Sequence, residues 1–183
     1  MKLKINRKSC TVSYGDTCKE ACEEQIDLVC SLYGEEFEVT DDLIVDAASK
    51  GVRVDWFLDF FDYSFTGKLA LPRGRYEWYK NGELHREDGP AVKRADGTKE
   101  WYREGRLHRE DGPAIEWVDG TKEWFRKGKL HRKDGPAIEY ANGTRKWYRN
   151  EKLHRENGPA IEQADGTKEW YRNGRPCGDE ETA

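Results

Sequence analysis

A short internal repeat constrains this chain of 183 residues more than any other feature. Five tryptophans recur at a period of 23; they are Trp78, Trp101, Trp124, Trp147 and Trp170. All four histidines and four Gly-Pro-Ala triplets keep the same period. The first repeat covers residues 77–99, three more follow, and a fifth begins at Glu169 and breaks off after Gly174. A unit this short cannot bury an apolar face alone, so the chain must form an array in which neighbours stabilise one another.

Two turn signals divide each repeat into short extended stretches. Asn81-Gly82 offers two residues that tolerate positive φ, as a type I′ hairpin turn requires, and Asp96-Gly97 is interpreted in the same way. The stretches between these turns are too short and too aromatic for helices. Because proline cannot donate to a β-ladder, each Gly-Pro-Ala triplet is placed at the start of a strand. The pattern predicts one β-hairpin per repeat, joined into a single antiparallel sheet that grows by roughly 10 Å per repeat.

The composition favours a thin structure. Charged residues make up 37% of the chain and hydrophobic ones 36%, and the mean hydropathy is −1.04, which is too polar for a thick core. The aromatic content of 12% is nevertheless too high for disorder. We interpret the repeated tryptophans as the material that holds a thin sheet together, with stacking on bases or sugars as the alternative.

Residues 1–70 lack the repeat and carry helix signals. Residues 2–6 alternate and predict a short strand. A capping-box pattern at residues 17–20 predicts the start of one helix, and Thr40 is expected to cap a second helix over residues 41–50. A third helix is expected over the aromatic-rich residues 55–62. These elements would make a small helical domain that caps the first edge of the array.

The predicted fold class is therefore α+β. Residues 1–70 are assigned to the acidic helical domain, and residues 71–183 to an elongated single-layer antiparallel β-sheet of hairpin repeats. The first region has 8 Lys and Arg against 14 Asp and Glu, a net charge of −6, whereas the second has 24 against 22, a net charge of +2. This balance argues against direct nucleic-acid binding and gives little attraction to anionic membranes.

Neither export nor a membrane span is expected from the sequence. The N-terminus has no apolar stretch behind its basic residues, and no apolar run is long enough to cross a bilayer as a helix. A cytoplasmic protein with reduced thiols is the expectation.

The cysteines and histidines of the chain favour structural roles over metal binding. Four cysteines near the N-terminus invite a zinc hypothesis, but they form no Cys-x-x-Cys pair and are better explained as core thiols; they are Cys10, Cys18, Cys22 and Cys30. The histidines would stand roughly 10 Å apart, too far to share a metal ion. No phosphate loop or nucleophile motif is found, so we expect neither a cofactor nor enzymatic activity.

Candidate binding residues are those that break the repeat, because the repeated ones cannot mark a single place along the array. Trp117, Tyr140 and Arg94 occupy the same repeat position with different side chains. With the acidic residues Asp41, Asp42 and Asp46 they form our predicted partner-binding set. The alternative is a repeated basic row next to acidic residues, formed by Arg86, Arg109, Arg132 and Arg155.

The combination Trp-x-x-x-Gly-x-Leu-His followed by Asp-Gly-Thr, repeated with the period of the tryptophans, resembles a variant of the MORN repeat over residues 77–174. The form Leu-His-Arg-x-Asp-Gly-Pro-Ala is similar to repeats of bacteriophage and large-DNA-virus proteins. The resemblance implies a non-enzymatic protein that binds another protein or self-associates. A phage-encoded inhibitor of a host protein, such as a CRISPR or other defence effector in the host cytosol, is the concrete expectation. A carbohydrate-binding cell-wall module and a membrane-surface scaffold are the alternatives.

Overall fold

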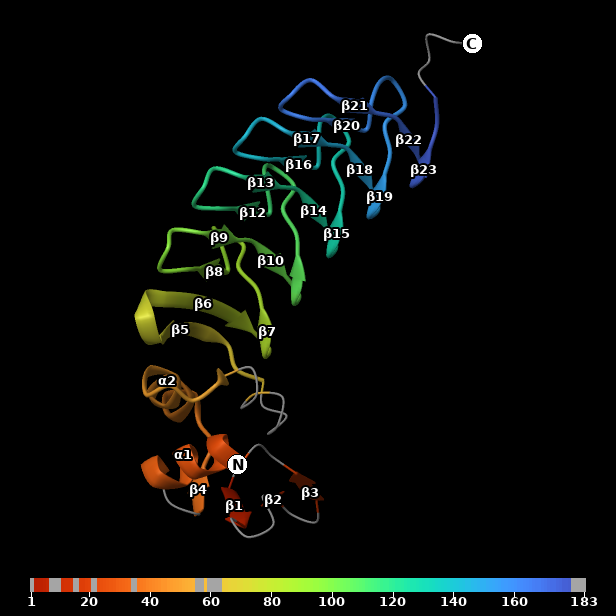
Figure 1. Cartoon of the computed structure of the whole chain (residues 1–183). Coiled ribbons are helices and arrows are strands. Elements are labelled where there is room, and N and C mark those ends of the chain that lie inside the picture. Colours follow the sequence, from red (N-terminus) through yellow and green to blue (C-terminus); the bar gives the residue numbers. More distant parts are fainter. Residues whose placement is uncertain are drawn as a thin grey trace. The chain divides into compact units, whose positions relative to one another are not determined.

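The computed structural model describes residues 2–6, 11–14, 17–20, 23–33, 36–54, 58 and 64–178 (Figure 1). The predicted α+β class is confirmed, since two helices are followed by a long antiparallel sheet of many short strands. Contacts within the chain define two compact parts, residues 1–83 and residues 84–183, which we call the N-terminal part and the repeat array. The boundary inferred from sequence, after residue 70, lies inside strand β5 (Gly67–Leu71).

The N-terminal part contains a sheet as well as helices. Its four antiparallel strands lie in the order β3-β2-β1-β4; they are β1 (Lys2–Asn6), β2 (Thr11–Tyr14), β3 (Thr17–Glu20) and β4 (Glu36–Glu38). The predicted strand at residues 2–6 is confirmed. The capping-box interpretation of residues 17–20 is wrong, because this segment pairs along its whole length with β2, and helix α1 (Glu23–Tyr33) begins three residues later. A four-residue ladder satisfies more backbone groups than the two bonds of a capping box.

Helix α2 (Asp41–Ser49) is capped as the sequence predicts. The Thr40 hydroxyl accepts a hydrogen bond from the Leu43 amide at 3.2 Å, and three side chains of one face, Ile44, Ala47 and Ala48, are buried. After this helix come β5, a 3₁₀ turn (Pro72–Gly74), β6 (Arg75–Lys80) and β7 (Glu83–Leu84). Most of the third predicted helix, residues 55–62, lies outside the described residues.

Cys18 belongs to β3 and Cys30 to α1, so these two thiols do not lie on one helix. Cys30 is buried in α1 and Cys177 is exposed, both as free thiols. Cys10 and Cys22 lie outside the described residues. Within the part of the chain that the structure describes, no helix is long and apolar enough to cross a membrane.

The repeat array contains two hairpins per repeat instead of the single one predicted. The hairpins that turn at Gly97, Gly120, Gly143 and Gly166 belong to one antiparallel sheet. Its strands within the array, in spatial order, are β8 (Val92–Lys93), β9 (Lys99–Glu100), β12 (Ile115–Glu116), β13 (Lys122–Glu123), β16 (Ile138–Glu139), β17 (Arg145–Lys146), β20 (Ile161–Glu162) and β21 (Lys168–Glu169).

The other hairpins form separate two-stranded ribbons (Figure 1), namely β10 (Tyr102–Arg103) with β11 (Arg106–Leu107), β14 (Phe125–Arg126) with β15 (Lys129–Leu130), β18 (Tyr148–Arg149) with β19 (Lys152–Leu153), and β22 (Tyr171–Arg172) with β23 (Arg175–Pro176). The sheet and the ribbons therefore alternate along the chain.

The two kinds of turn differ. The ribbon turns place both central residues at positive φ, for example 52° at Glu104 and 65° at Gly105, as the sequence predicts for this turn type. In the sheet turns only the glycine is left-handed, with φ 97° at Gly97, so the same expectation is wrong for Asp96. Asp96 instead accepts the Thr98 amide through its side chain at 2.8 Å, and this bond holds the pKa of the Asp96 carboxyl below its usual value.

Pairing in the sheet sorts side chains onto two faces. Ile115 lies opposite Glu100 and Glu123, whereas its neighbour Glu116 lies opposite Lys99 and Lys122. Residues directly opposite one another share a face, and successive residues point to opposite faces. One face thus carries buried Val and Ile side chains alternating with Glu or Lys. The other, which we call the ladder face, begins with the basic pair Lys93 and Lys99 and alternates between acidic and basic side chains from Lys99 onward.

From Trp101 onward, each tryptophan of the repeat stands where the chain passes from the sheet to a ribbon, whereas Trp78 lies within β6. An arginine eight residues later lays its guanidinium over the indole ring, with Cζ 4.1 Å from the ring centroid for Arg109 over Trp101. The distance is 3.9 Å in the next two repeats, for Arg132 over Trp124 and Arg155 over Trp147. These three tryptophans therefore support the fold, although they line a junction and not a sheet strand. Cation–π contacts of this kind contribute about 0.5–2 kcal/mol each.

The other side of each guanidinium faces a glycine of the Asp-Gly-Pro or Asn-Gly-Pro loop. A β-carbon added to Gly112 would meet Cζ of Arg109 at 2.9 Å, and one added to Gly135 would meet Cζ of Arg132 at the same distance. Arg132 Nη1 also donates to the Pro136 carbonyl at 3.1 Å and to Glu139 at 2.8 Å. Each arginine is thus held between an indole and a backbone, and it joins the loop to the ladder face.

Histidines connect successive ribbons. His108 Nδ1 accepts the backbone N–H of Lys127 in the next ribbon at 3.1 Å, and His85 and His154 accept the amides of Glu104 and Asn173 in the same way. Since these Nδ1 atoms are acceptors, the proton lies on Nε2, which faces a glutamate carboxylate at 3.5 Å in His108. The four histidines therefore serve the structure of the array.

We predict that Gly112→Ala lowers the free energy of unfolding by about 1–3 kcal/mol, because the new methyl group displaces the Arg109 guanidinium from Trp101. Gly112 is suited to the test since its φ is not in the left-handed region, so that alanine introduces no backbone strain. Urea unfolding of the single variants and the double variant with Arg109→Ala measures the effect. If Gly112→Ala costs as much in the Arg109→Ala background as in the wild type, the close approach is not its cause.

Candidate functional site

The residues that break the repeat lie together on the face opposite the ladder face, which we call the variable face. Its four equivalent positions are Arg94, Trp117, Tyr140 and Gln163. Each contacts the side chain six residues later across its own hairpin: Arg94 Nε lies 2.5 Å from Glu100, Trp117 Nε1 donates to Glu123 at 2.8 Å, and Gln163 donates to Glu169 at 3.1 Å. At Tyr140 the partner is Lys146, whose Nζ lies 5.3 Å from the ring centroid. Arg94, Trp117 and Gln163 thus each contact a glutamate, whereas Tyr140 contacts a lysine.

The partner glutamates receive a second bond from the ribbon tyrosines. Tyr102 donates to Glu100 at 3.0 Å, and Tyr171 donates to Glu169 at 3.1 Å, which raises the pKa of Tyr171. The bond to Glu100 likewise raises the pKa of Arg94. The third and fourth repeats lack this bond, because the third has Phe125 in place of tyrosine and the fourth has Lys146 in place of glutamate.

Apolar side chains are exposed in the middle of the variable face. Trp117 is 38% exposed and Tyr140 36%, and Val118, in the turn that follows Trp117, is 66% exposed. Trp117 and Tyr140 are equivalent positions of adjacent repeats, so they lie roughly 10 Å apart along the sheet. A shallow hollow of about 260 Å³ begins at Tyr140 and continues over Lys146 and Ile161 to Gln163. The structure therefore brings together Trp117 and Tyr140 of the predicted set, and places Arg94 in line with them in the preceding repeat.

The acidic residues of the predicted set belong to the N-terminal part. Asp41 and Asp42 occupy the first turn of α2, where they complement the helix dipole. Asp46 is engaged by its own surroundings: it accepts from Lys50 at 2.6 Å and from the Tyr33 hydroxyl at 2.7 Å, and the bond to Lys50 lowers the pKa of the Asp46 carboxyl. Burial, together with the bond to Asp46, raises the pKa of Tyr33.

The alternative basic row is bound into the fold. Arg109, Arg132 and Arg155 cover indole rings and pair with carboxylates of the ladder face, at 3.2 Å to Glu116, 2.8 Å to Glu139 and 2.7 Å to Glu162. Arg109 also contacts Asp111 at 2.9 Å, which lowers the pKa of the Asp111 carboxyl. Arg86 donates to the Pro90 carbonyl at 3.4 Å. In the sequence, three arginines of this row are followed directly by Glu87, Glu110 or Glu156.

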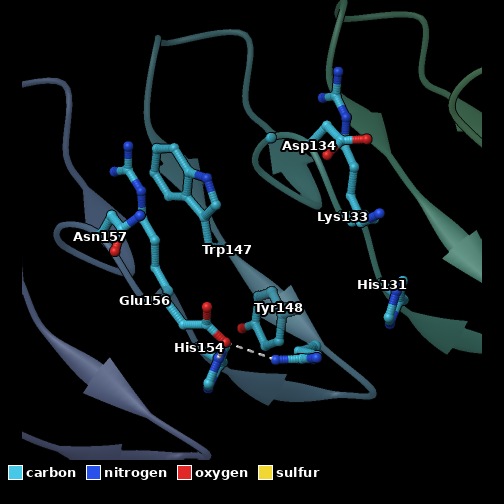
Figure 2. A pocket seen from close by; sticks show the side chains of 12 residues that line it. His131, Lys133, Asp134, Trp147, Tyr148, His154, Glu156 and Asn157 are labelled. Carbon is cyan, nitrogen blue, oxygen red and sulfur yellow. Dashed lines mark hydrogen bonds and ion pairs between the residues drawn. The ribbon is translucent and has the colours of Figure 1, made fainter.

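Grooves of similar size separate successive Gly-Pro-Ala loops next to the stacked tryptophans. Their volumes are about 610 Å³ between the first and second repeats, 660 Å³ between the second and third, and 630 Å³ between the third and fourth. Figure 2 shows the last of these, in which Trp147 and Tyr148 stand between the loop with Lys133 and Asp134 and the loop with Glu156 and Asn157. These grooves were not anticipated from the sequence, although the eight-residue spacing of Trp and Arg in every repeat was visible in it.

A metal centre receives no support from the described residues, among which no group of three His, Cys, Asp or Glu side chains could hold an ion. No protein-family model and no curated protein matches the chain. The likeness to MORN repeats thus stays a prediction from the motif.

We predict that Trp117→Arg leaves the stability nearly unchanged, because the new side chain can pair with Glu123 as Arg94 pairs with Glu100. In contrast, Trp124→Ala should lower the free energy of unfolding by about 3 kcal/mol, since it removes the ring under Arg132. Urea unfolding followed by tryptophan fluorescence and circular dichroism gives both values. Equal losses for the two variants would mean that Trp117 is a structural residue.

Proposed function

We propose that this chain is a non-enzymatic protein-binding repeat protein, and that it binds its partner through the variable face. The observation that carries the proposal is the exposure of Trp117 and Tyr140 at equivalent positions of adjacent repeats. The other two positions carry polar residues that are paired with glutamates. Aromatic side chains offer large contact area for little loss of conformational entropy, and they dominate the energetics of protein interfaces.

The arrangement also gives the partner a fixed register. A surface that repeats with the tryptophans offers several equivalent places, whereas Trp117, Val118 and Tyr140 occur together only once. The polar residues Arg94 and Gln163 border this apolar centre on either side along the array, as polar rims border the centres of protein interfaces.

The covered tryptophans favour protein binding over carbohydrate binding. A cell-wall module that cages sugars between hairpins needs open ring faces on its repeated aromatics. In this array the guanidinium groups of Arg109, Arg132 and Arg155 lie over those rings. The rings are therefore engaged by the fold.

The narrower proposal is a phage-encoded inhibitor of a host protein, such as a CRISPR or other defence effector, acting in the host cytosol. Its support is the likeness of the repeat motif to bacteriophage and large-DNA-virus repeats. Self-association through the same face is the alternative use of an exposed aromatic pair.

Affinity capture with quantitative mass spectrometry, from a lysate of the cells in which the protein is naturally made, tests the binding proposal. The repeats themselves supply the variants. Trp117→Arg copies the Arg94–Glu100 pair, and Tyr140→Gln with Lys146→Glu copies the Gln163–Glu169 pair, so the triple variant should stay folded. We expect the triple variant to capture at least tenfold less of a protein that the wild type captures.

Gln163→Arg is the matched control, because it also copies the Arg94–Glu100 pair but keeps both exposed aromatics. It should retain capture. Identical captured proteins for the wild type and a folded triple variant would refute the role of the variable face. Size-exclusion chromatography with light scattering on the same variants distinguishes self-association from binding to another protein.

A further inference from the structure

We propose that the grooves on either side of the loop 131–135 form a second binding surface, which takes an acidic polypeptide segment. This surface lies beside the ribbons and the stacked tryptophans, and it shares no lining residue with the hollow on the variable face. It is therefore independent of the function proposed above, and a partner could occupy either surface alone.

The positive charge of the array is concentrated in the third repeat. Residues 123–145 contain six Lys and Arg against three Asp and Glu, a net charge of +3. The same count gives 0 for the first repeat, −2 for the second and +1 for the fourth. The net charge of residues 71–183 as a whole, +2, does not reveal this local excess of positive charge.

One substitution within the repeat accounts for much of the excess. Where the other repeats have Glu87, Glu110 and Glu156, the third has Lys133. In the fourth repeat Glu156 accepts from Arg149 at 3.0 Å and lies 3.6 Å from His154 Nε2. In the third, Lys133 takes the place of that carboxylate beside the equivalent residues Arg126 and His131. Neither Arg126 nor Lys133 forms an ion pair with any residue that the structure describes.

The change reverses the charge of the grooves. The groove between the first and second repeats is lined by three arginines and four carboxylates. The groove between the third and fourth is lined by four cationic side chains, Arg132, Lys133, Arg149 and Arg155, and by two carboxylates, Asp134 and Glu156 (Figure 2). Lys133 also lines the groove between the second and third repeats, together with Arg126. Its ammonium group thus serves both grooves.

Other departures from the repeat occur at the next ribbon turn. His131 Nδ1 contacts the Asn150 side chain at 3.0 Å, whereas the other histidines accept a backbone amide. Glu151 takes a left-handed conformation, φ 67°, where the other ribbon turns have glycine. A side chain there is unfavourable for the backbone. The first of these departures involves His131, which lies in the same loop as Lys133.

An acidic peptide fits this surface better than a nucleic acid. Carboxylates interrupt the cations at the two grooves, so the positive region is a patch and not a continuous track for phosphates; they are Glu110, Asp111, Asp134 and Glu156. An arginine guanidinium occupies one face of each indole in these grooves, which leaves less ring surface for stacking on bases. An extended acidic peptide can place a few of its carboxylates near Lys133 and Arg126. It need not pass many carboxylates of the protein to do so.

Fluorescence polarisation with a fluorescein-labelled peptide of eight glutamates, at low and physiological salt, tests the proposal. We expect Lys133→Glu to weaken binding at least tenfold. This variant returns the loop to the residue of the other three repeats, so its melting temperature should match that of the wild type. Lys127→Glu is the matched control: it makes the same charge change, its equivalent residue is Glu104, and it lines neither groove. It should weaken binding no more than twofold.

Equal losses for the two variants would show that net charge alone attracts the peptide, and unchanged binding of the folded Lys133→Glu variant would overturn the site. An oligonucleotide of eight thymidines is measured under the same conditions. If it binds more tightly than the peptide and depends on Lys133 in the same way, the surface is a nucleic-acid site and the proposal is wrong. These outcomes leave the role of Trp117 and Tyr140 untouched.

Discussion

A guanidinium group held between an indole ring and a glycine is the contact on which the repeat array depends. The sheet strands are only two residues long, too few to hold their own register by backbone bonds alone. The arginine supplies the missing connection, because it contacts the tryptophan at the end of the sheet strand, the loop carbonyl and a carboxylate of the ladder face. Its hydrogen bonds to charged groups are of the stronger kind.

This arrangement explains how so polar a chain forms an ordered array. The small and β-branched residues Ala114 and Ile115, and their equivalents, are buried in every repeat, but they supply little apolar area. Arginine stems and indole rings contribute the rest, since both present apolar surface while keeping a polar group hydrogen-bonded. With the fold secured on the ladder face and by the histidines, the variable face and the loop of Lys133 are free to differ between repeats. The two proposed binding surfaces are the places where the repeats differ from one another.

Much of the architecture could be predicted from the sequence, because it follows from local rules applied at a fixed period. The helix cap at Thr40, the ribbon turns with two residues at positive φ and the antiparallel sheet all depend on a few neighbouring residues. The second hairpin of each repeat was missed because the turn signals locate reversals but do not say which strands join one sheet. Residues 17–20 were misassigned because pairing with β2 depends on a tertiary contact that overrides a local capping pattern.

The binding residues were only partly predictable. Repeat position identified Trp117 and Tyr140, and the structure adds that both are exposed and which side chain each one contacts. The co-occurrence of Tyr140 with Lys146, where other repeats pair with glutamate, could have been found in the sequence. The role of the arginines could not be predicted. An arginine next to a glutamate in the sequence gives no sign that its guanidinium lies over the indole of a tryptophan eight residues earlier. Lys133 stands out only in the net charge of single repeats, because the excess of the third repeat is averaged away over residues 71–183.

A double-mutant cycle on Trp147 and Arg155 tests the central claim most directly. The free energy of unfolding is measured in urea for Trp147→Ala, Arg155→Ala and the double variant. If the stacked guanidinium joins the repeat together, the two losses are coupled by at least about 1 kcal/mol. Losses that add to within about 0.5 kcal/mol would show that the ring and the cation stabilise the array independently, and would contradict the account.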